Sequence, residues 1–169
     1  MLKIINNLSP FFEDCYRRIS VREYAKIAGI SPPTSSKLLV SYWKDGLLKN
    51  EEDRNYKFFY ANKQSEIFIK LSNIYWGIRL NEFIELIKKR VISPTVILFG
   101  SLAKAEAKID SDIDIAIISS KKEIDIKYLE KKLKRNIHLF WFKSIKEIKN
   151  KEIATNIING FRLYGRLKI

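Results

Sequence analysis

Residues 95–119 read TVILFGSLAKAEAKIDSDIDIAIIS, and the rest of the chain can be interpreted from this stretch. Two apolar runs, 96–99 and 113–118, are typical of buried strands. The second run is preceded by Asp112 and contains Asp114. Because side chains alternate between the faces of a strand, these two carboxylates should project to the same side. A divalent cation such as Mg²⁺ would relieve their repulsion, since it prefers oxygen ligands and shares its shell with substrate phosphates.

Gly100 and Ser101 end the first of these runs. A glycine after a buried strand lets the backbone turn sharply and approach a ligand closely. Residues 102–107 are rich in alanine and predict the first turns of a helix. Free N–H groups at the start of that helix, together with the Ser101 hydroxyl, would suit a phosphate. The stretch therefore predicts a phosphate-binding turn beside a pair of metal-binding carboxylates.

The same residues resemble the signature of the polymerase beta-like nucleotidyltransferases, and most closely that of the minimal nucleotidyltransferases. The usual motif of that branch is G-S-x-A-x-G-E-A-x-x-x-S-D-x-D. Here it stands as GSLAKAEA at 100–107 and SDID at 111–114, with Ala105 where the motif has glycine. The resemblance spans residues 93–165.

This resemblance implies an αβ domain with a mixed sheet that acts on ATP or another nucleoside triphosphate. Gly100 and Ser101 match the nucleotide-binding positions of the family. Asp112 and Asp114 match its catalytic carboxylates, which hold Mg²⁺ or Mn²⁺.

A third carboxylate of the family lies on a later strand and helps to hold the metal ion that activates the attacking hydroxyl. Residues 136–142 predict this strand, and its apolar pattern places His138, the only histidine, at the matching position. Three interpretations remain open. His138 could act as a base or as a ligand of Mn²⁺ or Zn²⁺. It could mark a protein that binds nucleotide without transferring it, or it could be a packing residue, with Asp110 or Glu106 supplying the third acid.

Residues 1–64 predict a domain of a different kind. Ser20 and Ser31 are typical helix N-caps, and Gly29 separates the two helices that they open. Strand-like residues on either side of a charged loop, 49–55, follow the second helix. The order and the lengths of these segments resemble the winged helix-turn-helix family.

In a winged helix, the early polar face of the second helix enters the major groove of double-stranded DNA. The positions that match this role are Thr34, Ser35, Ser36 and Lys37 on the helix, with Arg54 and Lys57 on the wing. The acidic run at 51–53 opposes DNA binding, because it would face the phosphates. A winged helix used only for protein contacts is the alternative.

Residues 65–92 predict a long linker helix between this domain and a nucleotidyltransferase domain at 93–169. Its apolar positions, among them Ile67, Leu71 and Ile78, follow helical spacing. This apolar face could pack between the two domains or against a second copy of the chain in a homodimer. The sequence thus predicts an α+β protein made of a winged helix, a linker helix and an αβ domain.

Composition limits the partners and the compartment. The formal net charge of the 169-residue chain is +13. Such a charge favours nucleic acid or nucleotide phosphates, although a biased genome or a heat-adapted surface would also explain it. No apolar run is long enough to cross a membrane, and the N-terminus lacks the pattern of a signal peptide. Cys15 is the only cysteine, so we expect a cytoplasmic protein without an intramolecular disulfide or a cysteine-based zinc site.

Two functions remain open. The first is transfer of a nucleoside monophosphate to a protein or RNA. The resemblance to minimal nucleotidyltransferases implies an antitoxin that modifies a partner toxin of the HEPN class. The second is a DNA-binding transcriptional regulator whose nucleotidyltransferase domain is degenerate and only binds nucleotide or a partner. Fold alone does not decide between them.

Overall fold

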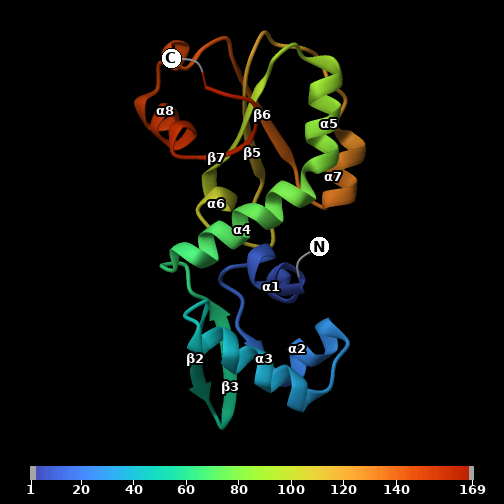
Figure 1. Cartoon of the computed structure of the whole chain (residues 1–169), viewed down its shortest axis with the longest axis vertical. Helices are drawn as coiled ribbons and strands as arrows, with labels where there is room; N and C mark the ends of the chain where they lie inside the picture. The colour runs from blue at the N-terminus through green and yellow to red at the C-terminus, as the bar shows by residue number, and fades with distance from the viewer. Residues whose placement is uncertain (1–2, 168–169) are drawn as a thin grey trace. The chain divides into compact units, whose positions relative to one another are not determined.

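A computed structural model describes residues 3–167, which form the helices and strands labelled in Figure 1. The chain divides into two compact units. Unit 1 extends to Ser72 and includes Ala105–Ile109, whereas unit 2 comprises Asn73–Lys104 and the residues from Asp110 onward. Within the described part of the chain, no helix is both long and apolar enough to span a membrane.

Unit 1 combines helices with an antiparallel sheet. Its elements are α1 (Lys3–Glu13), β1 (Ile19–Ser20), α2 (Val21–Ala28), α3 (Pro32–Lys44), β2 (Leu48–Asp53), β3 (Tyr56–Ala61) and the first half of α4 (Glu66–Arg79). The strand order is β1-β3-β2. Both predicted N-caps are present, because the Ser20 hydroxyl accepts from the Glu23 N–H and the Ser31 hydroxyl accepts from the Thr34 N–H.

The hairpin of β2 and β3 is tighter than the sequence predicts. Residues 49–55 were expected to form a loop, but the strands pair from Leu48 opposite Ala61 to Asp53 opposite Tyr56. Only Arg54 and Asn55 remain in the turn, with φ of 47° and 66°. Two consecutive residues with positive φ match the twist of the flanking strands, so a two-residue turn closes the hairpin.

Unit 2 is built around a four-stranded mixed sheet. Its further elements are α5 (Asn81–Arg90), β4 (Thr95–Phe99), α6 (Gly100–Ala103), β5 (Ile113–Ile118), α7 (Lys127–Leu133), β6 (Ile137–Phe142), the 3₁₀ turn η1 (Ile145–Glu147), α8 (Lys151–Ile158) and β7 (Phe161–Tyr164). The strand order is β6-β5-β4-β7, with β5 parallel to β6 and β4 antiparallel to both of its neighbours. The predicted α+β class and the predicted mixed sheet are therefore confirmed.

The residues that were expected to form one linker helix form two, α4 and α5. Leu80 lies between them with φ of −92° and ψ of 4°. Trp76, Leu80 and Phe83 are all fully buried. These three residues are spaced four and three positions apart, so one buried apolar stripe continues from α4 into α5 across the break.

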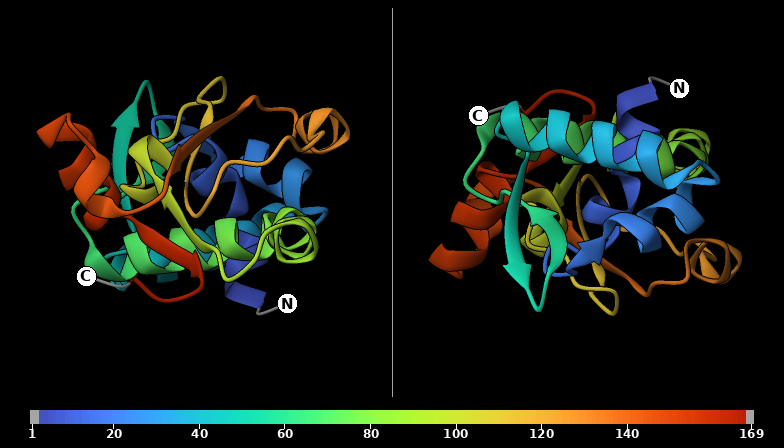
Figure 2. Two further views of the ribbon diagram at one scale, coloured as in Figure 1. Left: turned by 90° about the horizontal axis from the view of Figure 1, so that it is seen from above. Right: turned by 90° about the horizontal axis from the view of Figure 1, so that it is seen from below.

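Helices cover both faces of the sheet of unit 2. Figure 1 and Figure 2 show α8 on one side of the sheet and α5 and α7 on the other. On the α8 side, Ile97, Phe99 and Ala116 pack with Ile148 and Ile157 in one apolar cluster. Side chains alternate between the faces of a strand, so Asp114 lies on the same face of β5 as Ala116. The Asp114 carboxylate therefore lies next to this apolar cluster on that face.

Candidate functional site

Strand pairing brings Asp112, Asp114 and His138 together at one end of the sheet. Asp114 on β5 lies opposite Phe99 on β4 and opposite His138 on β6. Nδ1 of His138 is 3.5 Å from Oδ1 of Asp114, and its Nε2 is 3.9 Å from Oδ2 of Asp112. Because one imidazole ring approaches both carboxylates, the two acids lie on the same side of the chain.

Gly100 lies directly against Asp114. Its φ is 73°, and a Cβ at this position would collide with Oδ2 of Asp114. Both the backbone turn and the space beside the carboxylate therefore require glycine. Ser101 follows in the first turn of α6 and is partly exposed.

Ala105, which stands where the motif has glycine, adopts a backbone conformation that favours glycine. Its φ is 54°, and the residue is fully buried. A left-handed backbone conformation costs an L-amino acid about 1 kcal/mol. Ala105 in the turn after α6 therefore lowers the free energy of unfolding by about that amount.

Two residues that the sequence analysis missed hold Asp112 in place. Nδ2 of Asn136 donates to Oδ1 of Asp112 at 2.9 Å. Arg135 is only 6% exposed and donates from Nη1 to the carbonyl oxygen of Ser111 at 2.5 Å, and its guanidinium carbon is 5.2 Å from the ring centroid of Trp76. These contacts fix both the side chain of Asp112 and the backbone just before it. The only feature of the sequence that could have indicated this support is the Arg-Asn pair at the start of a predicted strand.

The surroundings of Asp114 disfavour its charge. Burial raises the pKa of this carboxyl group above its ordinary value of 3.8, the nearby His138 opposes that rise, and the like charge of Asp112 adds to it. A cation beside Oδ1 or Oδ2 would remove the penalty, since an opposite charge favours the ionised form.

No three His, Cys, Asp or Glu side chains within residues 3–167 form a cluster that could hold a metal ion. Mg²⁺ is usually bound by one or two carboxylates together with substrate phosphates. The pair formed by Asp112 and Asp114 thus fits a metal ion that enters with a nucleotide.

Among the residues expected to contact DNA, Ser35 is contradicted by the structure. It is fully buried, and its hydroxyl donates to the carbonyl oxygen of Val21 at 2.8 Å. Ser35, Leu39 and Tyr42 form the inward face of α3, so the helical period directs this serine away from solvent. Thr34 and Lys37 are exposed, and Ser36 is partly exposed.

The hairpin carries the two other expected DNA contacts. Arg54 is exposed in the turn, and Nζ of Lys57 is 5.3 Å from the ring centroid of Trp43. Two cations partly offset the charge of the three nearby acids, because Glu51 and Asp53 both pair with Arg18 and Glu52 lies opposite Lys57 in the hairpin. The acidic run therefore opposes a phosphate less than the sequence suggests.

A family model described as polymerase beta, nucleotidyltransferase, matches residues 81–168. The chain belongs to this family. A solved structure described as "Crystal structure of the toxin-antitoxin with AMP-PNP" is similar with a TM-score of 0.41 and 21% sequence identity, over 51% of this chain and 73% of the other. No curated protein matches the chain significantly. The family match assigns unit 2 to a nucleotidyltransferase fold, and residues 1–80 lie outside it.

In this nucleotidyltransferase, Asn136→Ala is expected to weaken metal–nucleotide binding about 10- to 100-fold, because loss of a hydrogen bond to a metal-binding carboxylate has effects of that size. Calorimetric titration with ATP and Mn²⁺ measures the change. Asn81→Ala, an exposed position on α5, is the matched control. Equal affinities for the wild type and Asn136→Ala would contradict the role of Asn136.

Proposed function

We propose that this nucleotidyltransferase transfers a nucleoside monophosphate from ATP or another nucleoside triphosphate to a hydroxyl group of a protein or RNA, in the manner of an antitoxin that modifies a HEPN-type toxin. The observation that carries the proposal is that Asp112 and Asp114 both lie within 4 Å of ring nitrogens of His138, with Gly100 against Asp114, in a chain of this family. The antitoxin role and the acceptor rest on the resemblance of the motif to minimal nucleotidyltransferases.

Each side chain has a distinct part in the proposed reaction. Backbone N–H groups at Gly100 and Ser101, with the Ser101 hydroxyl, hold the β- and γ-phosphates. Asp112 and Asp114 would hold Mg²⁺ or Mn²⁺, which would neutralise charge on the phosphates. The acceptor oxygen attacks the α-phosphorus in line, the new P–O bond forms, and the bond to the bridging oxygen breaks to release pyrophosphate.

We propose that His138 takes the proton of the attacking hydroxyl. Its side chain is 53% exposed, so an acceptor can reach it, and both carboxylates lie within 4 Å of the ring. An exposed imidazole between two anions suits a general base better than a packing residue. We therefore favour a catalytic role over the other two interpretations.

Labelled ATP tests the reaction class. With Mg²⁺ or Mn²⁺, label at the α-phosphate should appear on a protein or RNA acceptor from the same cells, whereas label at the γ-phosphate should leave with pyrophosphate. Transfer of the γ-label would identify phosphoryl transfer instead. If the protein neither transfers label from ATP nor binds the nucleotide, the proposal is wrong.

A second function, DNA binding, is favoured by the order of elements in unit 1. A helix, a short strand, two helices joined by a tight turn and a hairpin follow one another, as in winged helices. The proposed division is a DNA-binding domain at 1–64, a linker at 65–92 and the nucleotidyltransferase domain at 93–169. In the alternative function, the chain is a transcriptional regulator, and its nucleotidyltransferase domain binds nucleotide or a partner without transfer.

The exposed face of α3 supports an interface with double-stranded DNA. Thr34, Lys37, Ser41 and Lys44 recur at helical spacing, and all four are exposed. With Ser35 excluded, the proposed contacts are Thr34, Ser36 and Lys37 on the helix, and Arg54 and Lys57 on the hairpin. Short hydroxyl side chains read bases only weakly, so phosphate contacts should dominate the affinity.

Lys37→Ala is expected to weaken binding to promoter DNA and to reduce the salt slope of the affinity by about 1, because one phosphate contact is lost. Fluorescence anisotropy at several salt concentrations measures both quantities. Lys70→Ala, an exposed lysine on α4, should leave them unchanged. DNA retention that does not depend on salt, or equal slopes for both variants, would argue against DNA binding through α3.

A further inference from the structure

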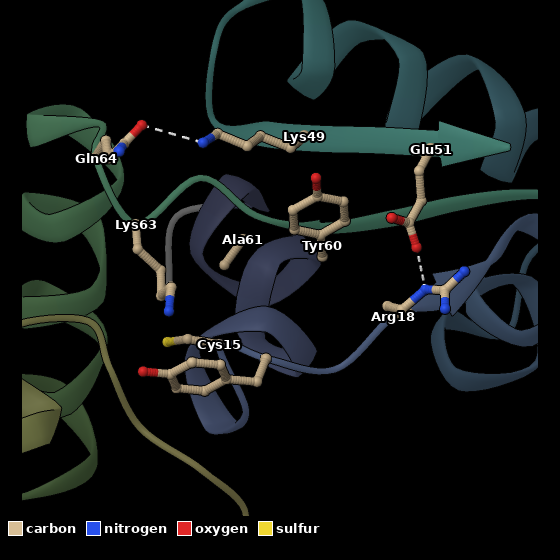
Figure 3. Close-up of a pocket in the computed structure, with 9 residues that line it drawn as sticks. Cys15, Arg18, Lys49, Glu51, Tyr60, Ala61, Lys63 and Gln64 are labelled. Atoms are coloured by element: carbon tan, nitrogen blue, oxygen red, sulfur yellow. Dashed lines mark hydrogen bonds and ion pairs between the residues drawn. The ribbon is translucent and has the colours of Figure 1, made fainter.

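Unit 1 contains a pocket that neither proposed function uses (Figure 3). It has a volume of about 390 Å³ and lies between the segment after α1, the strands β2 and β3, and the turn before α4. Volumes of roughly 300–1,000 Å³ are typical of small-molecule sites. The lining residues that decide its chemistry are Tyr16, Arg18, Lys49, Glu51, Tyr60 and Lys63.

The pocket has an excess of positive charge. Its only carboxylate, Glu51, is paired with Arg18, as Figure 3 shows. Lys49 and Lys63 have neutral partners instead: Nζ of Lys49 donates to Oε1 of Gln64 at 3.1 Å, whereas Nζ of Lys63 lies over an aromatic ring. Two ammonium groups thus line the pocket without a carboxylate in its wall to balance them, and a concave site of this kind attracts an anion.

Aromatic rings provide the second element of recognition. Nζ of Lys63 is 3.5 Å from the ring centroid of Tyr16, and Nζ of Lys108 is 5.6 Å from the same centroid. Tyr16 is nevertheless 47% exposed, and Tyr60 on β3 is partly exposed. Partly exposed tyrosines beside ammonium groups suit a planar group that carries phosphates.

We propose that this pocket binds a small phosphate-bearing molecule with a planar ring, a nucleotide, at a site separate from Asp112 and Asp114. The phosphates contact Lys49 and Lys63, and the planar ring packs on Tyr16 or Tyr60. The cavity, the charge excess and the exposed rings are independent of the nucleotidyl-transfer reaction, so the two sites can be tested separately.

A bound anion would also act on the hairpin. Arg18 pairs with Glu51 in the pocket and with Asp53 next to the turn, the latter at 3.5 Å. Phosphate oxygens near Arg18 compete with these carboxylates and leave negative charge uncompensated beside the turn. This consequence rests on the proposed DNA-binding function, since it predicts that the nucleotide weakens the contact between the hairpin and DNA.

The test uses the full chain with Asp112→Ala and Asp114→Ala, in the presence of EDTA, so that metal-dependent binding at the other site is removed. Calorimetric titrations with ATP, inorganic triphosphate and adenosine separate phosphate recognition from ring recognition. ATP is expected to bind more tightly than either of the other two. Lys49→Gln with Lys63→Gln should weaken ATP binding at least about tenfold, because charge-assisted hydrogen bonds to phosphate are lost.

Two further variants sharpen the result. Tyr16→Leu should weaken ATP but not inorganic triphosphate, because only the nucleotide places a ring on Tyr16. Lys70→Gln, outside the pocket, should change neither affinity. Equal affinities for ATP and triphosphate, no ATP binding in the Asp112→Ala, Asp114→Ala chain, or the same weakening by Lys70→Gln would overturn the proposal.

Discussion

Replacement of Asp112 or Asp114 by asparagine is expected to lower the rate of nucleotidyl transfer on the order of 10³-fold or more, which corresponds to several kcal/mol of transition-state stabilisation. An amide has the shape of the carboxylate but not its charge, so it cannot balance a divalent cation that neutralises the phosphates. Transfer of α-labelled phosphate from ATP to the acceptor measures the rate.

The control for this prediction is Glu123→Gln, an exposed acid of unit 2 that precedes α7. It removes the same charge away from the site and should leave the rate unchanged. Wild-type rates in Asp112→Asn or Asp114→Asn would show that the two carboxylates do not carry the reaction. Nucleotide binding that persists without transfer in the wild type would favour the non-catalytic alternative.

Asp114→Asn should also raise the thermal stability of the metal-free protein. Burial raises the pKa of Asp114 above 3.8, so the native state keeps this proton to a higher pH than the unfolded state does. The native state then binds more protons, and the free energy of unfolding falls as the pH rises from the ordinary pKa through the raised one. Thermal unfolding in EDTA at about pH 4 and at about pH 7 should show a larger gain at the higher pH. A destabilised Asp114→Asn variant would contradict this account.

The parts of the site that follow from local pattern could be predicted from the sequence. The apolar segments 96–99, 113–118 and 136–142 predicted three strands that are present as β4, β5 and β6. Period two then fixes which residues of each strand share a face, and this alone relates Asp114 to Asp112. Matching His138 to the third strand used the same apolar pattern, and the register puts it opposite Asp114.

Contacts that depend on pairing between distant strands could not be predicted. The bond from Asn136 to Asp112 spans 24 positions and exists because β5 and β6 are parallel, with α7 between them in the chain. Arg135 is charged and nearly buried, and it becomes a support for the Ser111 carbonyl only in that pairing. Composition assigns an arginine to the surface by default, so its role stays hidden until the fold is known.

The hairpin turn at Arg54 and Asn55 and the phase of α3 could not be predicted either. Arg54 and Asn55 both adopt positive φ without a glycine, so the Asn-Gly or Asp-Gly pair that usually indicates a two-residue turn is missing at this position. Ser35 was misplaced for another reason, because a run of small polar residues at the start of a helix does not reveal its phase. The buried Leu39 and Tyr42, at positions four and seven residues later, set that phase.

Exchange of His138 for aspartate is expected to raise the rate of transfer in Mg²⁺ about tenfold or more, because a carboxylate is a ligand that Mg²⁺ prefers and an imidazole is not. His138→Ala should instead lower the Mn²⁺-supported rate on the order of 10²-fold, the contribution typical of a general base. Initial rates of both variants in Mg²⁺ and in Mn²⁺ separate the two effects. Lys143→Asp, which places a carboxylate at an exposed position just after β6, controls for added charge.

The same experiment separates the three roles considered for His138. Its ring lies 3.5 Å from Asp114 and 3.9 Å from Asp112, so a change at this position reaches both carboxylates directly. If His138 is a base or a ligand, alanine lowers the rate and aspartate shifts the preference toward Mg²⁺. If the chain only binds nucleotide, the wild type transfers nothing, and His138→Asp restores the missing carboxylate and creates activity. Equal rates for the wild type and His138→Ala would show that His138 is a packing residue. Of the three side chains, only Asp112 and Asp114 would then be catalytic.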